Sequence, residues 1–332
     1  MLCTSHLIAA IVNGRKSSYK RSENVRSYRN RRANLQLNIR KEKREGSLLA
    51  KRRENTVDDD EKMTICSSAD ISEDILNFLG VLKDPSANVD ATYLAVRGIR
   101  CLLSVSKDIP VAQVLDSGAL PFLINLLHCE DDRINFEAVW ALTNIASTSY
   151  TSAVASAVPS IVPLLVSVNE NVREQAAWCL GNIAGDSTAL RDDVLKADAM
   201  TYIVMNIKNP ANESLLGNMV WSVSNLCRGR PLPKWELVEE ALLCLTRIIL
   251  DLEPLQFAPV LLDACWAVSY LSDGENERIQ KVVETGIIPK LVEFLSDPSL
   301  VTPALKVLAN IVSGSDEQTQ VGFLLRELCG CL

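Results

Sequence analysis

Apolar residues recur at helical spacing from about residue 71 onward, in segments divided by polar loops and Gly/Pro corners. One such segment, 172–186, carries Trp178, has Asn182 four positions later and ends in Asp186. Because positions i and i+4 lie on one face of a helix, the indole and the amide are expected side by side. The pattern therefore predicts a helix face that presents an aromatic ring next to an amide.

The same pair of residues returns at regular intervals along the chain. The pair recurs as Trp140 with Asn144 and as Trp221 with Asn225. A relaxed form is Trp266 with Tyr270, and Lys306 followed by Asn310 keeps the Asn alone. From Trp140 to Lys306 the successive spacings are 38, 43, 45 and 40 residues. A period near 40 with helical apolar spacing indicates two- or three-helix repeats of the armadillo or HEAT type.

A second landmark keeps the same phase. The corners 117–121 and 285–289 both carry Gly followed by Pro three residues on, and they lie 168 residues apart, or four periods of 42. Such a corner ends one short helix and starts the next, because Pro is tolerated in a first helical turn. Each unit is predicted as a short helix, a corner, a second helix such as 121–127, a polar loop, and a longer third helix that carries Trp and Asn.

This phasing predicts an all-α, right-handed armadillo-repeat superhelical solenoid. Six repeats are expected within 71–316, followed by an incomplete repeat at 317–332. The predicted divisions between repeats follow residues 113, 150, 188, 232 and 275.

Composition agrees with packed helices and excludes several classes of protein. Hydrophobic residues make up 48% of the chain but aromatic residues only 5%, which favours helices over a β-sandwich. No apolar run reaches 18 residues, so no membrane span is expected. The ten cysteines lack a C-x-x-C pair and are expected as reduced, small hydrophobic residues. With two histidines, no P-loop and no catalytic constellation, we expect no metal site, no cofactor and no enzyme activity.

Charge divides the chain into a basic arm and an acidic body. The arm, 15–55, follows an unassigned segment 1–14. Its stretch 15–53 has 15 Lys/Arg against three acidic residues, and the residues outside 15–53 comprise 19 basic and 38 acidic ones. An acidic linker is predicted at 56–70. The arm is too poor in apolar residues to fold alone, so we expect it to become ordered on a partner. It lacks the interleaved aromatic residues that bind nucleic acid, and direct nucleic-acid binding is not expected.

Several of these segments resemble a known family, importin-alpha (karyopherin alpha). The segments 136–147, 172–186, 221–228, 263–274 and 303–312 are similar to its second to sixth armadillo repeats, and the resemblance covers roughly 20–320. The arm resembles the importin-beta-binding segment of the family. The resemblance implies a nuclear import adaptor that shuttles between cytoplasm and nucleus. Such an adaptor binds Lys/Arg-rich nuclear localisation signals in a concave groove and links that cargo to importin-beta.

The resemblance also implies residue roles. In the arm, Lys51, Arg52 and Arg53 match the internal mimic of a signal, which would occupy the groove and inhibit it. The implied importin-beta-binding residues are Arg29, Arg31, Arg32, Arg40, Lys41, Lys43 and Arg44. The implied signal-binding residues are Trp140, Asn144, Trp178, Asn182, Asp186, Trp221, Asn225, Asp263, Trp266 and Tyr270. Their chemistry agrees: indoles accept the stem and charge of Lys or Arg, worth about 0.5–2 kcal/mol each, and Asn meets an extended backbone with both donors and an acceptor.

Two departures from the family pattern qualify this expectation. The interval from Asn144 to Trp178 is about four residues shorter than the family pattern, and the loss falls around 147–158. In addition, the Thr of the family's main Lys pocket has no clear match in this sequence. The sequence shows six repeats where the family has about ten, so a second signal site and binding to the export receptor are not expected. The alternatives are a truncated, recycling-defective or competitor form of the adaptor, and a general armadillo scaffold, which would favour a basic groove rather than this acidic body.

Overall fold

The computed structural model describes residues 71–104 and 108–320, which belong to one compact unit of the chain. Every regular element in these two ranges is an α-helix or a 3-10 helix. The predicted all-α class is therefore confirmed. The arm at 15–55, the linker at 56–70 and most of the predicted last segment, 321–332, lie outside the described residues.

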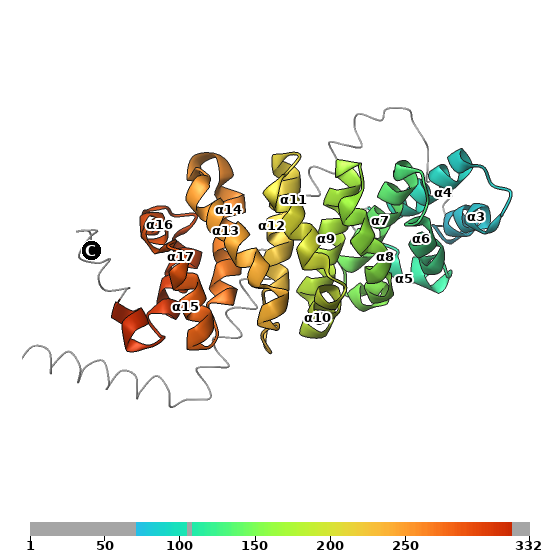
Figure 1. Ribbon diagram of the computed structural model, residues 1–332. Helices are drawn as coiled ribbons and strands as arrows, with labels where there is room; N and C mark the ends of the chain where they lie inside the picture. Colours follow the sequence, from blue (N-terminus) through green and yellow to red (C-terminus); the bar gives the residue numbers. More distant parts are fainter. Residues whose placement is uncertain (1–70, 105–107, 321–332) are drawn as a thin grey trace, which may run out of the picture. The chain divides into compact units, whose positions relative to one another are not determined.

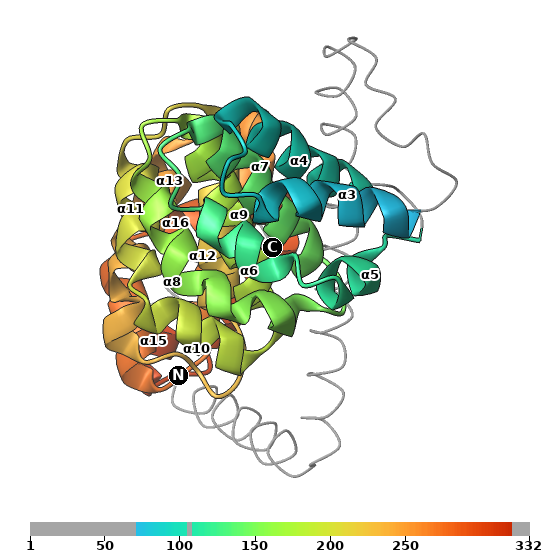
Figure 2. The same cartoon turned by 90° about the vertical axis from the view of Figure 1, so that its right-hand side faces the viewer.

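The longest helix of each repeat lies in one layer, in which each packs against the next along the chain (Figure 1). They are the predicted third helices of the repeats: α4 (Val89–Leu102), α7 (Asp132–Ala146), α9 (Glu170–Asp186), α12 (Glu213–Leu226), α14 (Pro254–Leu271) and α17 (Val301–Ile311). Figure 2 looks at the same unit from the end formed by α3 and α4, so that later helices lie behind earlier ones. This layer carries every tryptophan that the sequence pattern singled out.

Shorter elements precede each of these helices. The second helices are α3 (Ile71–Lys83), α6 (Leu120–Leu126), α8 with η2 (Val158–Ile161 and Val162–Val166), α11 (Ala199–Lys208), α13 (Glu239–Asp251) and α16 with η4 (Ile288–Glu293 and Phe294–Ser296). The first helices are α5 (Val111–Asp116), η1 (Thr151–Ala157), α10 (Thr188–Lys196), η3 (Trp235–Leu237) and α15 (Asn276–Glu284). The predicted order of short, second and longer third helix is confirmed from α5 onward.

Two of the approximate predicted divisions fall inside a helix. The division after residue 188 lies one residue into α10 (Thr188–Lys196). The boundary between the first two repeats was expected after residue 113, but this position lies inside α5, which begins at Val111 directly after Pro110. The repeat spacing fixes the phase of a unit and not the residue at which its first helix starts. Pro110 decides that start, because it has no N–H to continue a preceding helix.

Local sequence signals explain where the helices turn and begin. The corner residues Gly118 and Gly286 have φ values of 79° and 74°, a region that residues with a Cβ rarely adopt. Proline follows in the first turn of α6 and of α16, as predicted. Four third helices begin at an Asn or Asp whose side chain accepts a hydrogen bond from the first-turn backbone: Asn88, Asp131, Asn169 and Asn212.

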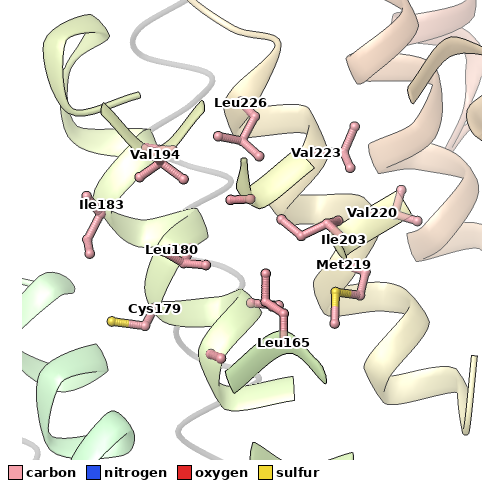
Figure 3. Packing of buried hydrophobic residues seen from close by; sticks show 14 of the residues in the cluster. Leu165, Cys179, Leu180, Ile183, Val194, Ile203, Met219, Val220, Val223 and Leu226 are labelled. Carbon is pink, nitrogen blue, oxygen red and sulfur yellow. The ribbon is translucent and has the colours of Figure 1, made fainter. Parts of the chain in front are cut away.

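One continuous apolar core lies between the helices of each repeat and extends from one repeat to the next. Figure 3 shows a part of it, where Leu165, Leu180, Ile203 and Met219 come together from η2, α9, α11 and α12. Cys179 belongs to the same cluster. The six cysteines in the described ranges are all free thiols, and four of them are buried, which agrees with the predicted role as small hydrophobic residues.

The shortened third repeat keeps its third helix intact. Before it, the first helix of this repeat is the 3-10 helix η1, and the second is the short α8 followed by the 3-10 helix η2. Thr151 is buried there, and its hydroxyl donates to the carbonyl oxygens of Ala146 and Thr148 at 2.9 and 2.7 Å. This threonine therefore closes the C-terminal end of α7, and α9 runs from Glu170 to Asp186 as in its neighbours.

Candidate functional site

Four indoles occupy equivalent positions in four consecutive helices of the long layer. Trp140 lies in α7, Trp178 in α9, Trp221 in α12 and Trp266 in α14. Trp140 and Trp178 are each 6% exposed, and the other two are half-buried. The predicted tryptophan series thus occupies one repeated position of the long layer, a row that is buried in α7 and α9 and half-buried in α12 and α14.

Contacts between neighbouring helices keep this row in register. The ring of Trp221 lies against Gly181, because a Cβ on Gly181 would stand only 2.5 Å from Cζ3 of that ring. Gly181 directly precedes Asn182 and lies one turn after Trp178 in α9. The indole of Trp221 therefore meets the turn of α9 that carries Trp178 and Asn182.

The predicted asparagines are buried, and the amide of each donates a hydrogen bond to the preceding repeat. Nδ2 of Asn144 donates to Oγ of Ser104 at 3.0 Å. Asn182 and Asn225 donate to the carbonyl oxygens of Thr143 at 3.4 Å and Gly181 at 3.0 Å. One N–H of each amide therefore links two repeats, a role that the sequence did not suggest. An amide has two N–H donors and an acceptor oxygen, so each side chain retains capacity for a further partner.

A second polar row, which the sequence analysis missed except for Asp263, runs one turn before the indoles. Its members are buried polar residues three positions before each tryptophan: Glu137, Gln175, Asn218 and Asp263. Nδ2 of Asn218 donates to Oε1 of Glu174 at 2.6 Å, which joins α12 to α9. The signal in the sequence was a polar residue recurring at i−3 within apolar helices, where a buried polar group needs a partner.

One cation already occupies the first position of the row. The guanidinium of Arg100 lies 4.3 Å from the ring centroid of Trp140, and its Nε contacts Oε2 of Glu137 at 2.6 Å. Both charged side chains are buried. Burial disfavours the charged guanidinium, but Glu137 outweighs this and holds the pKa of Arg100 above its ordinary value. The indole face and the carboxylate together thus stabilise a buried cation.

The predicted acid of the main pocket lies at a helix end. Asp186 is the last residue of α9 and is exposed. The negative end of the helix dipole is there, so the carboxylate and the helix terminus attract a cation together. Arg228 donates to the carbonyl oxygen of Gly185, which directly precedes Asp186 in the chain. In the fifth repeat, Tyr270 stacks on Trp266 with a centroid distance of 6.1 Å and takes the place of the amide.

The arm residues proposed for other roles cannot be placed. Lys51, Arg52 and Arg53, and the predicted importin-beta-binding residues from Arg29 to Arg44, lie outside the described residues. Over the described ranges, no group of three His, Cys, Asp or Glu residues is arranged to hold a metal ion. Likewise, no helix in those ranges is both long and apolar enough to cross a membrane.

Comparison with known families supports the interpretation of both parts of the chain. Residues 15–87 match the model of the importin beta binding domain, and this match starts where the basic arm was predicted to start. Residues 101–147 match the armadillo/beta-catenin-like repeat, and residues 132–183 match a HEAT-like repeat.

Most of the chain is similar to curated proteins of Oryza sativa subsp. japonica and Dictyostelium discoideum. Importin subunit alpha-1a of Oryza sativa subsp. japonica is 40% identical over 321 residues, which are 93% of this chain and 59% of that protein. Importin subunit alpha-B of Dictyostelium discoideum is 42% identical over 309 residues, 90% of this chain and 59% of that protein. A third, importin subunit alpha-1b of Oryza sativa subsp. japonica, is 42% identical over 68% of this chain and 43% of that protein. The chain thus spans about half the length of the curated relatives it matches.

Solved structures agree on the fold. A designed armadillo repeat protein in complex with the peptide (KR)4 aligns with a TM-score of 0.61 at 25% identity, over 71% of this chain and 98% of that one. Another designed armadillo repeat protein aligns with a TM-score of 0.63 at 23% identity, over 71% of this chain and 99% of the other. The described unit is an armadillo solenoid, and with its importin beta binding domain and its importin-alpha relatives the chain belongs to the importin-alpha family.

Proposed function

We propose that this chain is a nuclear import adaptor, which binds Lys/Arg-rich localisation signals along the row of tryptophans and binds importin-beta through its basic arm. One observation supports the signal site above all others. Arg100, held between the ring of Trp140 and the carboxylate of Glu137, is an example within the chain of how this layer accommodates a cation. Like other adaptors, it is expected to move between cytoplasm and nucleus with its cargo and to catalyse no reaction.

The proposed binding mode follows from the spacing of the row. A signal peptide lies extended across α7, α9, α12 and α14, and its Lys or Arg stems enter the intervals between successive indoles. Each stem gains apolar contact and each charge gains cation–π attraction, about 0.5–2 kcal/mol per side chain. The remaining donor and acceptor groups of Asn144, Asn182 and Asn225 meet the peptide backbone, and Asp186 pairs with the most deeply held Lys.

The similarity to a designed armadillo repeat protein in complex with the peptide (KR)4 supports this chemistry. Alternating Lys and Arg is the composition that a row of indoles and carboxylates favours. The acidic body, with 38 acidic and 19 basic residues outside 15–53, attracts such a peptide at long range. The general-scaffold alternative predicts the opposite preference, for acidic partners.

The arm is proposed to have two partners in turn. Its match to the importin beta binding domain supports importin-beta as the first. In the absence of importin-beta, Lys51, Arg52 and Arg53 are proposed to occupy the row and compete with cargo.

A titration of the full chain with a fluorescent Lys-rich signal peptide tests the proposal. Wild type is compared with a full-length variant carrying Lys51→Ala, Arg52→Ala and Arg53→Ala, each with and without importin-beta. The variant is expected to bind the peptide more tightly than wild type, and importin-beta is expected to remove most of that difference. Equal affinities throughout would refute the autoinhibition.

Point variants in the same titration locate the site. Trp178→Ala removes one cation–π contact, and Asn182→Ala removes one amide hydrogen bond to a desolvated peptide. Each should therefore weaken binding about tenfold or more. The matched control is Trp235→Ala, because Trp235 lies in η3 outside the row and contacts Arg278. Failure of the Lys-rich peptide to bind, or tighter binding of a Glu-rich peptide of the same length, would remove the adaptor proposal.

A further inference from the structure

The row of four tryptophans has a basic residue at each end. Arg100 lies 40 residues before Trp140, and Lys306 lies 40 residues after Trp266. Their helices, α4 and α17, are the neighbours of α7 and α14 in the long layer. The equivalent position of the six third helices therefore holds a cation, four indoles and a second cation.

At the first end, the cation is neutralised. Glu137 pairs with Arg100 while the guanidinium covers the ring of Trp140. The outer face of Trp140 is therefore filled by the chain itself, and this end presents no net charge from the pair. A peptide side chain cannot stack there without displacing a buried ion pair, which is costly because it leaves a carboxylate uncompensated.

At the second end, the hydrogen-bond partner of the cation is a neutral amide. The ammonium of Lys306 donates to Oδ1 of Asn310 at 3.0 Å, and an amide oxygen is a neutral partner. Nδ2 of Asn310 donates to the carbonyl oxygen of Ser269 at 2.9 Å and to Oγ of Ser272 at 3.1 Å. Both ends of this amide are thus engaged inside the chain. Lys306 is exposed, and within the described ranges no carboxylate lies within ion-pair distance of its ammonium.

The polar row also stops at this helix. Three positions before Lys306 stands Pro303, where the preceding four helices carry Glu137, Gln175, Asn218 and Asp263. The sixth helix consequently offers neither an indole nor a carboxylate to a further Lys or Arg. It offers an exposed positive charge at the edge of the row.

We propose that Lys306 selects the residue at one end of a bound signal, and so fixes its register; this inference rests on the proposed signal-binding function. The Lys/Arg run of the peptide fills the three intervals between Trp140 and Trp266. Where the peptide continues over α17, Lys306 favours an acidic or neutral residue and disfavours a further basic one. An exposed pair of opposite charges raises affinity about two- to fivefold, and an exposed pair of like charges lowers it by a similar factor.

Four peptides with one common Lys-rich run test this selection. Two carry Glu or Lys directly before the run, and two carry Glu or Lys directly after it. Their affinities are measured at low salt with the full chain in which Lys51, Arg52 and Arg53 are replaced by Ala, so that the arm does not compete. For each end of the run, the affinity of the Glu peptide is divided by that of the Lys peptide. This ratio should be about two- to fivefold larger at one end than at the other.

Substitution of the lysine then assigns the effect. Lys306→Glu should invert the preference at that end, and Lys306→Gln, which keeps a donor for Asn310, should abolish it. The control is Lys281→Glu in α15, which changes the net charge equally on an exposed side chain beside Glu284. The control should leave the ratios as in wild type.

The outcomes separate the two proposals. Binding of all four peptides with ratios that do not respond to Lys306→Glu would overturn the role of Lys306 and leave the adaptor function standing. Equal responses to Lys306→Glu and Lys281→Glu would also overturn it, because the effect would then be one of net charge. Absence of binding by all four peptides would overturn the proposed function and this inference with it.

Discussion

The indole of Trp221 lies directly on Gly181 of the preceding repeat. A Cβ at position 181 would stand 2.5 Å from Cζ3 of Trp221 and 2.6 Å from Oγ of Ser222. A glycine in the middle of a helix costs about 1 kcal/mol relative to alanine. Here the missing Cβ lets α12 approach α9 closely enough for Asn225 to reach the carbonyl oxygen of Gly181.

Gly181→Ala is therefore expected to harm both the stack and the site. The gain in helix propensity, about 1 kcal/mol, is smaller than the cost of overpacking, about 1–3 kcal/mol. The midpoint of urea unfolding should fall, and affinity for a Lys-rich peptide should fall with it as Trp221 is displaced. The control is Gly80→Ala in α3, where a Cβ meets no atom within 4 Å; it should raise the midpoint slightly. A rise at both positions would contradict the packing account.

Asp186→Asn is expected to separate binding from stability. The carboxylate lies at the C-terminal end of α9, where it is repelled by the helix dipole, so its loss should stabilise the fold by about 0.3–1 kcal/mol. Peptide affinity should nevertheless fall several-fold, most strongly at low salt. Asp251→Asn is the matched control, because Asp251 ends α13 in the same way and is exposed outside the row. Unchanged affinity in Asp186→Asn, measured by fluorescence anisotropy, would remove this acid from the site.

Glu137→Gln is expected to be among the most destabilising substitutions of a charged residue. It leaves the guanidinium of Arg100 buried without its counter-charge, at a cost of about 3–5 kcal/mol. The exposed pair of Arg230 and Asp273, joined at 3.0 Å, is the comparison, and Asp273→Asn should cost about 0–1 kcal/mol.

A double variant completes the test of the buried pair. Replacing Arg100 by Met together with Glu137 by Leu should recover most of the loss, because no charge is then left buried. Thermal unfolding followed by circular dichroism measures all three variants. A Glu137→Gln protein as stable as the Asp273→Asn protein would show that the pair is not needed to hold α4 on α7.

Stability is expected to fall as the pH rises above about 9. Burial raises the pKa of Cys179 to about 12 from an ordinary value of 9.0, and it does the same for Cys227 and Cys265. Above pH 9 the unfolded thiols lose their protons while the folded ones keep them, so the unfolded state gains stability. Each thiol contributes about 1.4 kcal/mol per pH unit over this window.

Urea unfolding in the presence of a reductant at pH 8, 9 and 10 measures this slope. Cys179→Ala should be less stable than wild type at pH 8, because it leaves space in the core. Its free energy of unfolding should fall less steeply with pH, because one buried thiol no longer contributes to the slope. A slope identical to that of wild type would mean that the buried thiol does not govern the alkaline loss.

The sequence by itself was sufficient for the fold class, for the repeat period and for the helix that carries each Trp. Those features depend on patterns within about 15 residues: apolar spacing of 3.6, a Gly/Pro corner such as 118–121, and an N-cap such as Asn169. The same local patterns also indicated that Trp and Asn share one helix face. Resemblance to a family then gave the site its expected ligand, but not the partners of its side chains.

Only the tertiary structure decided how successive repeats meet. The hydrogen bond from Asn225 to Gly181, the seat of Trp221 on that glycine and the pairing of Arg100 with Glu137 each join residues 37 to 44 positions apart. No local periodicity specifies which side chain of one helix faces which turn of the next, because that depends on the approach of two whole helices. For the same reason, the sequence indicated no role for Lys306, whereas its position in the structure, bonded to Asn310 on a helix packed against α14, led to the proposal that it is the charged end of the row.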